Sequence, residues 1–281
     1  MFEYQLNAAH VQAYRRHLQA EERSTGTIEK YLRDIAAFLT WLEGKTVTKD
    51  LAAAWKGALL TAGYAPGTVN GMVCAINGLF RFLGWDECRV KFLKVQRKLF
   101  RDPGRELTRR EYDRLHESAQ TMGKERLALM METICATGIR VSEVRAITVE
   151  AARQGRAEIS LKGKIRQILL PVKLCRKLLK YARQQKTASG AIFRTKSGKE
   201  LSRHQIWAEL KGLCQHAGVA PSKVFPHNLR HLFARMFYQA SGDIVRLADV
   251  LGHSSMETTR IYLVTSGNEH RRQLERLGLV T

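Results

Sequence analysis

The chain has 281 residues, of which 44% are hydrophobic, so it can build one large domain or two ordinary ones around a real core. Lys and Arg number 47 against 26 Asp and Glu, and the formal net charge of +21 is typical of a protein that binds a polyanion. Nucleic acid fits this charge better than a membrane surface does, because no basic amphipathic helix stands out from the rest. A merely basic soluble protein is the alternative on charge alone.

Five cysteines are scattered along the chain and form no C-x-x-C pair, which argues against a zinc site and a disulfide framework. The first residues do not form a signal peptide, and no apolar run is long enough to cross a bilayer. No G-x-x-x-x-G-K-[ST] loop is present to bind ATP. We therefore expect a cytoplasmic, nucleoid-associated protein with no metal, no cofactor and no membrane partner.

The first hundred residues predict four helices, at about 8–22, 27–43, 49–62 and 66–83. In the second, apolar residues from Ile28 to Leu42 recur at helical spacing and form one stripe. The fourth begins at Pro66, which suits the first turn of a helix. It contains Gly71 and Gly78, each of which costs up to about 1 kcal/mol relative to Ala. Close approach of DNA or another backbone and tight helix packing explain these glycines equally well.

A basic stretch separates these helices from the rest of the chain. Residues 89–105 contain seven Lys or Arg and one Asp, and Asp102-Pro103-Gly104 breaks any helix there. We interpret 89–106 as a linker between a domain at 1–88 and a domain at 107–281. So basic a linker can run along a phosphate backbone, which makes its side chains candidate DNA contacts, namely Arg97, Lys98 and Arg101. The alternative is a solvated connector with no ligand.

The second domain is predicted to be mainly helical with one small hairpin. Thr108 and Glu111 have the spacing of a capping box at the start of its first helix. Further helices are predicted at about 124–136, 141–147, 172–185, 202–216 and 268–279. Two short strands, 158–161 and 165–171, join at Lys162-Gly163-Lys164, and 191–193 is a candidate third strand. Arg140 opens the short helix at 141–147, and Glu143 lies one turn further on, close enough to orient it.

The stretch from 226 to 262 brings chemistry-bearing side chains into a compact helical unit. His227 and Arg230 are three residues apart near the start of a helix and so share a face. A second helix ends at Gly252, which suits a left-handed cap, and His253 follows at once. Tyr262 lies two turns into a third helix. The apolar residues of the first helix are predicted to line its opposite side, namely Leu229, Leu232, Phe233, Met236, Phe237 and Ala240.

This set of residue types suits phosphoryl transfer. Arg offers a planar fork that grips phosphate oxygens, and His exchanges protons near neutral pH. Tyr, with an ordinary pKa of about 10, attacks phosphorus only where positive groups surround the target. The set therefore predicts transfer through a phosphotyrosine, although any single His or Tyr on a helix is more often structural.

The motifs of the second domain resemble those of the tyrosine recombinases, which are the phage integrases and the Xer-type site-specific recombinases. The resemblance is carried, in the family's order, by A-T-G-I-R-V-S-E at 136–143, the Lys162-Gly163 hairpin, H-N-L-R-H at 227–231, L-G-H at 251–253 and Tyr262. The first domain is similar to the family's core-binding domain, notably T-I-E-K-Y-L-R-D-I-A-A-F-L at 27–39. The resemblance implies a mainly α fold: a four-helix, SAM-like core-binding domain and an α-rich catalytic domain with a small antiparallel hairpin.

The resemblance also implies a role for each residue of the site. Arg140 and Arg230 would hold the scissile phosphate, with Glu143 supporting Arg140. Tyr262 would be the nucleophile and remain as a 3′-phosphotyrosyl linkage. The proton and hydrogen-bonding roles would fall to Lys162 for the leaving 5′ oxygen, His227 for the nucleophile's proton and His253 as donor to the phosphate. Lys164 is the alternative hairpin lysine and, like Arg235, a candidate DNA contact.

The implied activity is site-specific recombination, in which strands of two DNA duplexes are cut and rejoined without metal or ATP. The expected assembly is a monomer when free and a homotetramer on double-stranded DNA. The alternatives are a type IB topoisomerase, which uses similar chemistry as a monomer, and a catalytically inactive DNA-binding protein. The sequence leaves open the target site and the participation of an accessory recombinase or a directionality factor.

Overall fold

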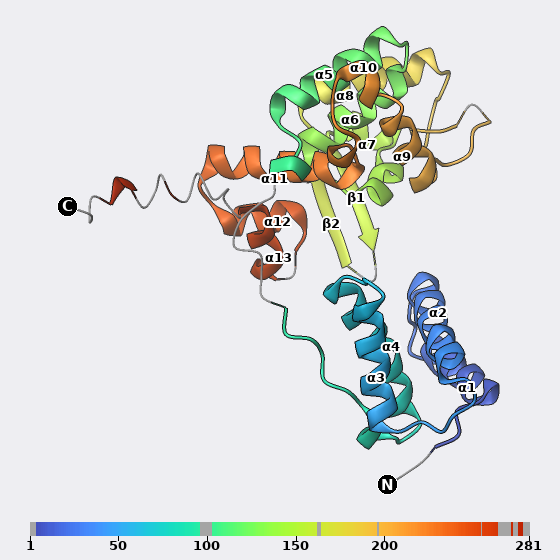
Figure 1. Cartoon of the computed structure of the whole chain (residues 1–281). Coiled ribbons are helices and arrows are strands. Elements are labelled where there is room, and N and C mark those ends of the chain that lie inside the picture. Colours follow the sequence, from blue (N-terminus) through green and yellow to red (C-terminus); the bar gives the residue numbers. More distant parts are fainter. Residues whose placement is uncertain are drawn as a thin grey trace. The chain divides into compact units, whose positions relative to one another are not determined.

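The computed structural model describes residues 4–95, 103–161, 164–195, 197–253, 255–263, 271 and 275–277. The chain divides into two compact units, Met1–Arg97 and Lys98–Thr281, each of which is described by itself. The described residues are mainly helical, as predicted, and their sheet has two strands (Figure 1). Within those ranges, no helix is long and apolar enough to cross a membrane.

The first unit is a small helical bundle, in agreement with the prediction. Its helices are α1 (Ala8–Ala20), α2 (Thr25–Leu42), α3 (Lys49–Thr61), α4 (Pro66–Phe82) and the short η1 (Asp86–Cys88). α2 packs on α4 because both carry an apolar stripe, and Ile35, Phe38 and Ile76 are fully buried between them. A Cβ on Gly78 of α4 would collide with the hydroxyl of Tyr14, so tight packing of α1 against α4 explains that glycine.

After η1 the chain runs back along α4, where two asparagine amides hold its backbone. Asn77 Nδ2 donates to Val90 O at 2.9 Å, and Asn77 Oδ1 accepts from Val90 N at 3.0 Å. Asn70, two turns earlier in α4, makes the same pair with Leu93 at 2.9 and 2.8 Å. The first residues of the predicted linker are therefore bound to the first unit.

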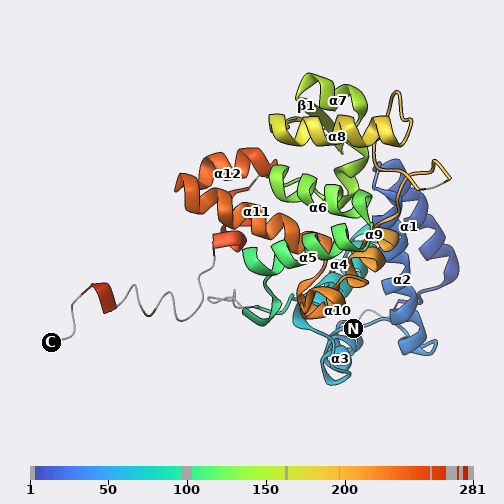
Figure 2. The ribbon, with the colours of Figure 1, turned by 90° about the horizontal axis from the view of Figure 1, so that it is seen from above.

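The second unit is built around α6, which packs against α5, α8 and α11 (Figure 2). The residues from Leu127 to Met131 of α6 are all buried, as expected for a helix enclosed by neighbours. The first elements of the unit are η2 (Pro103–Arg105), α5 (Arg109–Thr121), α6 (Glu125–Thr137), η3 (Val141–Ala146) and α7 (Val149–Gln154). The next are β1 (Arg156–Leu161), β2 (Lys164–Leu169), α8 (Val172–Gln184), α9 (Arg203–Lys211), α10 (Cys214–Ala217) and η4 (Pro221–Lys223).

Three predictions from local sequence signals in this unit can be compared with the structure, and one of them is confirmed. The capping box of Thr108 and Glu111 is confirmed at the start of α5. The single helix predicted at 202–216 is wrong, because Gly212 ends α9 before α10 begins. The third strand predicted at 191–193 is also wrong, since Ala191 makes only an isolated bridge to Thr148.

The hairpin is antiparallel, with β1 paired to β2 from Arg156–Leu169 to Leu161–Lys164. Ala157 and Ile159 of β1 and Ile168 of β2 are buried, whereas Glu158 and Gln167 are exposed, as strand alternation requires. This arrangement presents one apolar face of the hairpin to the helices.

The chain ends in a helical group made of α11 (Pro226–Ser241), α12 (Ile244–Leu251), α13 (Met256–Arg260) and η5 (Ile261–Leu263). Figures 1 and 2 both show α11 beside α12. The apolar stripe predicted for α11 is partly wrong: Leu229 and Leu232 are buried, but Met236 is 42% exposed and Arg230 takes a core position. The helix predicted at 268–279 lies mostly outside the described residues.

Candidate active site

Arg230 of α11 is the centre of the candidate site and is only 1% exposed. Its Nη1 donates to Gly138 O at the end of α6, and its Nη2 donates to Leu251 O at the end of α12 at 2.8 Å. Both carbonyls lie at helix C-termini, where the helix dipole favours a cation. Burial lowers the pKa of Arg230, and a hydrogen bond with Tyr262 acts in the opposite direction. The guanidinium nevertheless remains charged at neutral pH.

Arg140 precedes η3 and is held by Glu143, which confirms the predicted pairing. Glu143 Oε1 accepts from Arg140 Nη1 at 3.0 Å, and Oε2 accepts from Arg140 N at 2.7 Å. The acid is 3% exposed. Burial would raise the pKa of Glu143, but the hydrogen bond from Arg140 N and the charge of Arg166 outweigh it and leave this pKa below its ordinary value. Glu143 is therefore a buried carboxylate shared by two arginines.

His253 follows the cap of α12 and is fixed through both ring nitrogens. Its Nε2 lies 3.0 Å from Arg230 Nη2, and its Nδ1 lies 2.8 Å from Thr259 Oγ1. Because a guanidinium only donates, Nε2 accepts and the ring proton lies on Nδ1. Burial, followed by the charges of Arg230 and Arg140, lowers the pKa of His253 to about 4, so the ring is neutral at pH 7. In this state His253 has no Nε2 proton to donate.

Tyr262 of η5 is 5% exposed and lies among these groups. Its ring stacks on His253, with centroids 5.7 Å apart and planes at 12°. The ring of His231 meets it edge-on at 4.5 Å, and that of His227 lies 6.3 Å away. Burial and the charges of Arg230 and Arg140 also lower the pKa of His227. Of the predicted site residues, Arg140, Glu143, His227, Arg230, His253 and Tyr262 thus form one cluster.

The structure does not place the side chains of several basic residues that were predicted to belong to the site or to contact DNA. Lys162 and the linker residues Arg97, Lys98 and Arg101 lie outside the described residues. The backbone of Lys164 pairs with Leu161 at the end of the hairpin, and the place of its side chain is not described. The roles assigned to these basic residues stay predictions.

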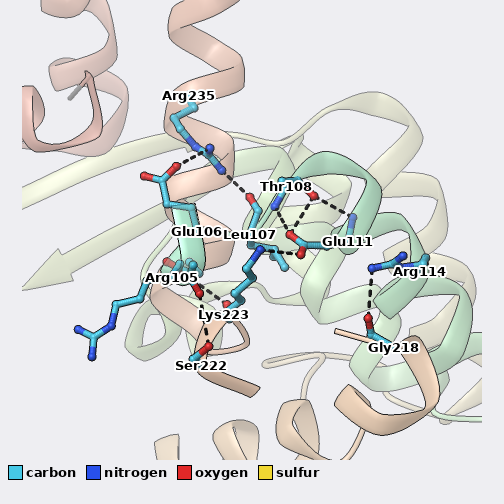
Figure 3. A network of polar contacts seen from close by, with 12 residues as sticks. Arg105, Glu106, Leu107, Thr108, Glu111, Arg114, Gly218, Ser222, Lys223 and Arg235 are labelled. Carbon is cyan, nitrogen blue, oxygen red and sulfur yellow. Dashed lines mark hydrogen bonds and ion pairs between the residues drawn. The ribbon is translucent and has the colours of Figure 1, made fainter. Parts of the chain in front are cut away.

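Arg235 points into its own unit (Figure 3). Its Nη1 donates to Glu106 Oε2 at 2.8 Å, and its Nη2 donates to Leu107 O. Asn228 of the same helix donates to Arg105 O at 2.6 Å. These bonds anchor α11 to the segment by which the chain enters the unit. The DNA contact predicted at Arg235 gains no support, because its guanidinium is already engaged with the protein.

Two residues at the site were not predicted from the sequence, Arg166 and Thr259. Arg166 of β2 bonds with Glu143, and Thr259 of α13 is fully buried against His253. A signal for Arg166 did exist: strand alternation places it on the same face as the buried Ile168, where a charged side chain needs a partner. No pattern in the sequence indicates Thr259, since the role of its hydroxyl depends on a contact with the His253 ring that only the fold creates.

Most of the chain matches two family models, one for each domain. Residues 105–269 match the phage integrase family, and residues 11–87 match the N-terminal SAM-like domain of phage integrases. The chain belongs to the phage integrase family of tyrosine recombinases. This tyrosine recombinase is a site-specific recombinase that cuts and rejoins DNA, as predicted.

Curated relatives match it over most of their length. The tyrosine recombinase XerC of Roseiflexus castenholzii is 34% identical over 278 residues, which cover 90% of this chain and 87% of the relative. The tyrosine recombinase XerA of Pyrococcus furiosus is 29% identical over 289 residues, covering 100% of this chain and 98% of the relative.

Solved structures share the fold of this tyrosine recombinase. One is the XerH site-specific recombinase bound to difH substrate, in a pre-cleavage complex, with a TM-score of 0.70 and 19% identity. The match covers 95% of this chain and 84% of the XerH chain. Another is a lambda integrase dimer bound to a COC' core site, with a TM-score of 0.74 and 18% identity. The match covers 92% of this chain and 77% of the lambda integrase chain.

Proposed function

We propose that this recombinase breaks a DNA strand by attack of the Tyr262 oxygen on a phosphodiester. A bond forms between the phenolic oxygen and phosphorus, and the bond from phosphorus to the 5′ oxygen breaks. The phenol proton passes to His227, and Lys162 protonates the leaving 5′ oxygen. The strand is held as a 3′-phosphotyrosyl ester until another 5′ hydroxyl displaces the tyrosine, so the energy of the phosphodiester is conserved and ATP is not consumed.

The observation that carries the proposal is the place of the Tyr262 phenol. It hydrogen-bonds with the buried guanidinium of Arg230 and stacks on His253. Phosphoryl transfer needs mainly positioning and stabilisation of the charge that develops on the phosphate oxygens. Arg140 and Arg230 supply that charge in a site whose carboxylate, Glu143, is already shared between two cations. The charge that metal ions supply in other phosphoryl-transfer enzymes comes here from these side chains.

His253 becomes a hydrogen-bond donor to the phosphate by a change of tautomer, in which Nε2 instead of Nδ1 carries the ring proton. In the described state its Nε2 accepts from Arg230, and its Nδ1–H faces Thr259. When a phosphate oxygen accepts the hydrogen bond from Arg230 Nη2, His253 Nε2 is no longer needed as its acceptor and can carry the ring proton. The hydroxyl of Thr259 can both donate and accept, so it can turn to donate to Nδ1. Thr259 therefore holds the ring in either proton arrangement.

We further propose that four copies act together on two duplexes. A structure with the same fold is a lambda integrase tetramer bound to a Holliday junction, with a TM-score of 0.73 and 18% identity. Strand exchange between two duplexes needs two strands of each to be cut, and four single-tyrosine copies supply the four cuts. Accessory proteins are not required by this scheme.

The first experiment is covalent capture. The full chain is incubated in EDTA with fragmented DNA, denatured, and the DNA that stays bound is sequenced to define the target site. Nicked duplexes that carry the site then trap the intermediate, because the short fragment with the freed 5′ hydroxyl diffuses away and cannot displace the tyrosine. We expect Tyr262→Phe to bind these duplexes with unchanged affinity and to form no adduct. The matched control is Tyr238→Phe, since Tyr238 packs against the apolar cluster that contains Tyr262, and we expect it to trap DNA like the wild type.

An adduct formed by Tyr262→Phe would contradict the assignment of the nucleophile. Loss of the adduct in EDTA would contradict the proposal that side chains alone supply the charge. Relaxation of a supercoiled plasmid that lacks the captured site would favour a topoisomerase over a recombinase.

A further inference from the structure

Arg166 joins three parts of the second unit that each carry a residue of the candidate site. It lies on β2, four positions after Lys162 in the sequence, and pairs across the hairpin with Ile159. Its Nη2 donates to Glu143 Oε2 at 2.5 Å, and its Nη1 donates to Val250 O at 3.1 Å. The side chain is 17% exposed, so both bonds are made in a largely dehydrated place. None of the roles assigned above uses this residue.

The first of these bonds controls how strongly Glu143 holds Arg140. Glu143 Oε2 accepts from both Arg166 and Arg140 N, while Oε1 accepts from Arg140 Nη1. Without Arg166, the guanidinium of Arg140 would be the only one facing a buried carboxylate. Turning Arg140 toward a phosphate would then leave that carboxylate without a charged partner, so Arg140 would be less free to turn.

The second bond fixes the turn from which His253 emerges. Val250 O and Leu251 O are the last carbonyls of α12, and they accept from Arg166 and Arg230 respectively. Two guanidiniums therefore hold the end of this helix, directly before Gly252 and His253. Gly252 has a φ of 64°, and a Cβ built on it would lie 2.5 Å from Arg166 Cδ and 2.8 Å from its Nη1. The absence of a side chain at Gly252 is what lets Arg166 pass.

We propose that Arg166 is a positioning residue of this recombinase, which sets Arg140 and His253 at their working separation by bridging Glu143 and the end of α12. It does not touch the DNA phosphate itself. Gly252 completes this arrangement, because a Cβ there would collide with the Arg166 side chain and force it to shift. The proposal rests on the proposed function in that Arg140 and His253 are taken to act on the phosphate.

The test measures adduct formation on the nicked duplex at saturating DNA, with affinity measured separately. We expect Arg166→Gln to slow adduct formation at least about tenfold, because displacements near 1 Å at a reacting centre cost up to about 100-fold. Its DNA affinity is expected to stay within about threefold of the wild type, since the residue binds protein groups rather than DNA. Arg166→Lys keeps the charge but not the fork, and should recover part of the rate. The matched control is Arg156→Gln, an exposed arginine of the same hairpin, which should behave as the wild type.

A second pair of variants isolates the contact between Arg166 and Gly252. Gly252→Ala should slow adduct formation about tenfold in the wild-type background, since it pushes Arg166 off its partners. In an Arg166→Ser background, the colliding atoms are gone, and only the backbone strain of an Ala at a φ of 64° remains, which is the same in both backgrounds. Gly252→Ala should therefore slow the reaction by less than about twofold more. Rate losses that simply multiply would overturn the proposal.

Outcomes for the two proposals are separable. Absence of any adduct with the wild type counts against the proposed function. An adduct with the wild type, together with an equal rate for Arg166→Gln, counts against the role of Arg166. If Arg166→Gln does not fold, Gly252→Ala decides, because it keeps the charge of Arg166 and only forces the side chain to move: a wild-type rate for that variant overturns the proposal.

Discussion

At the scale of single residues, the site is a group of cations held by helix ends and one carboxylate. Arg230 is buried as deeply as the core leucines, and its cost of dehydration is offset by carbonyls at the ends of α6 and α12. The same side chain therefore supports the packing of these helices and faces the candidate nucleophile. It follows that loss of activity in an Arg230 variant is not by itself evidence of a catalytic role. A variant must be shown to be folded first.

The neutral state of His253 predicts how the stability of the free protein depends on pH. Its pKa is about 4 in the fold, against about 6.5 in the unfolded chain. Between those pH values the unfolded chain binds a proton that the fold excludes, so stability falls as pH falls from about 6.5 toward 4. We expect the Tm to drop less between pH 7 and pH 5 for His253→Asn than for the wild type, as measured by differential scanning fluorimetry. His204→Gln, which changes an exposed ring of α9, is the control. Equal drops in all three proteins would show that His253 does not titrate as described.

At the scale of elements, both units use side chains of one helix to hold an irregular segment. In the first unit, Asn77 and Asn70 of α4 hold the backbone of Val90 and Leu93. In the second, Arg235 of α11 binds Glu106 and Leu107 (Figure 3). Asn228 of the same helix binds the backbone of Arg105. Each end of the predicted linker is thus tied to its own unit. The tie to α11 also supports the helix that carries Arg230.

The two asparagines of α4 offer a matched pair for a stability test. Asn77 is buried, whereas Asn70 is partly exposed, and each makes the same two bonds. Loss of a buried amide partner leaves backbone groups unsatisfied at a cost of about 1–3 kcal/mol. We expect Asn77→Ala to lower the free energy of unfolding by about that amount and Asn70→Ala by less, since water can replace its bonds. Urea unfolding measures the difference, and hydrogen exchange of residues 88–95 should rise most in Asn77→Ala. A larger effect from Asn70→Ala would contradict the role given to burial.

At the scale of the whole molecule, charge is the dominant feature. The formal net charge of +21 is spread over two units that are linked by a stretch with seven Lys or Arg. A chain with this charge gains much of its DNA affinity from release of counterions. This contribution to affinity comes from the phosphates and so does not depend on the base sequence, whereas contacts to the bases add specificity.

The charge predicts a steep dependence of DNA binding on salt. With about 6–10 phosphate contacts, affinity should fall by about 10³–10⁵ between 50 and 200 mM salt. Fluorescence anisotropy of a labelled duplex over that range measures the slope. A charge-reversed pair in the linker, Arg97→Glu with Arg101→Glu, should reduce the slope, whereas Glu158→Gln on the exposed face of β1 should not. A flat response of the wild type would contradict binding through many phosphate contacts.

Much of the site was predictable because it is encoded by local order and spacing. Arg140 with Glu143 and His227 with Arg230 are each three residues apart, and helical or 3₁₀ geometry brings such pairs together. The cap at Gly252 likewise places His253 directly after α12. Arg235 could not be predicted in the same way, because its partners lie 128 and 129 positions earlier in the chain.

The sequence by itself determined the helical stripes, the caps and the identity and order of the reactive side chains, since each depends on neighbours within about two turns. Only the tertiary structure decided that Arg166 bridges Glu143 and Val250, that Thr259 meets His253, and that the ring proton of His253 faces away from Arg230. These depend on which elements pack together. The pairing of groups 84 positions apart, as in Arg166 and Val250, is set by the packing of the whole core and by the need of buried charges for partners.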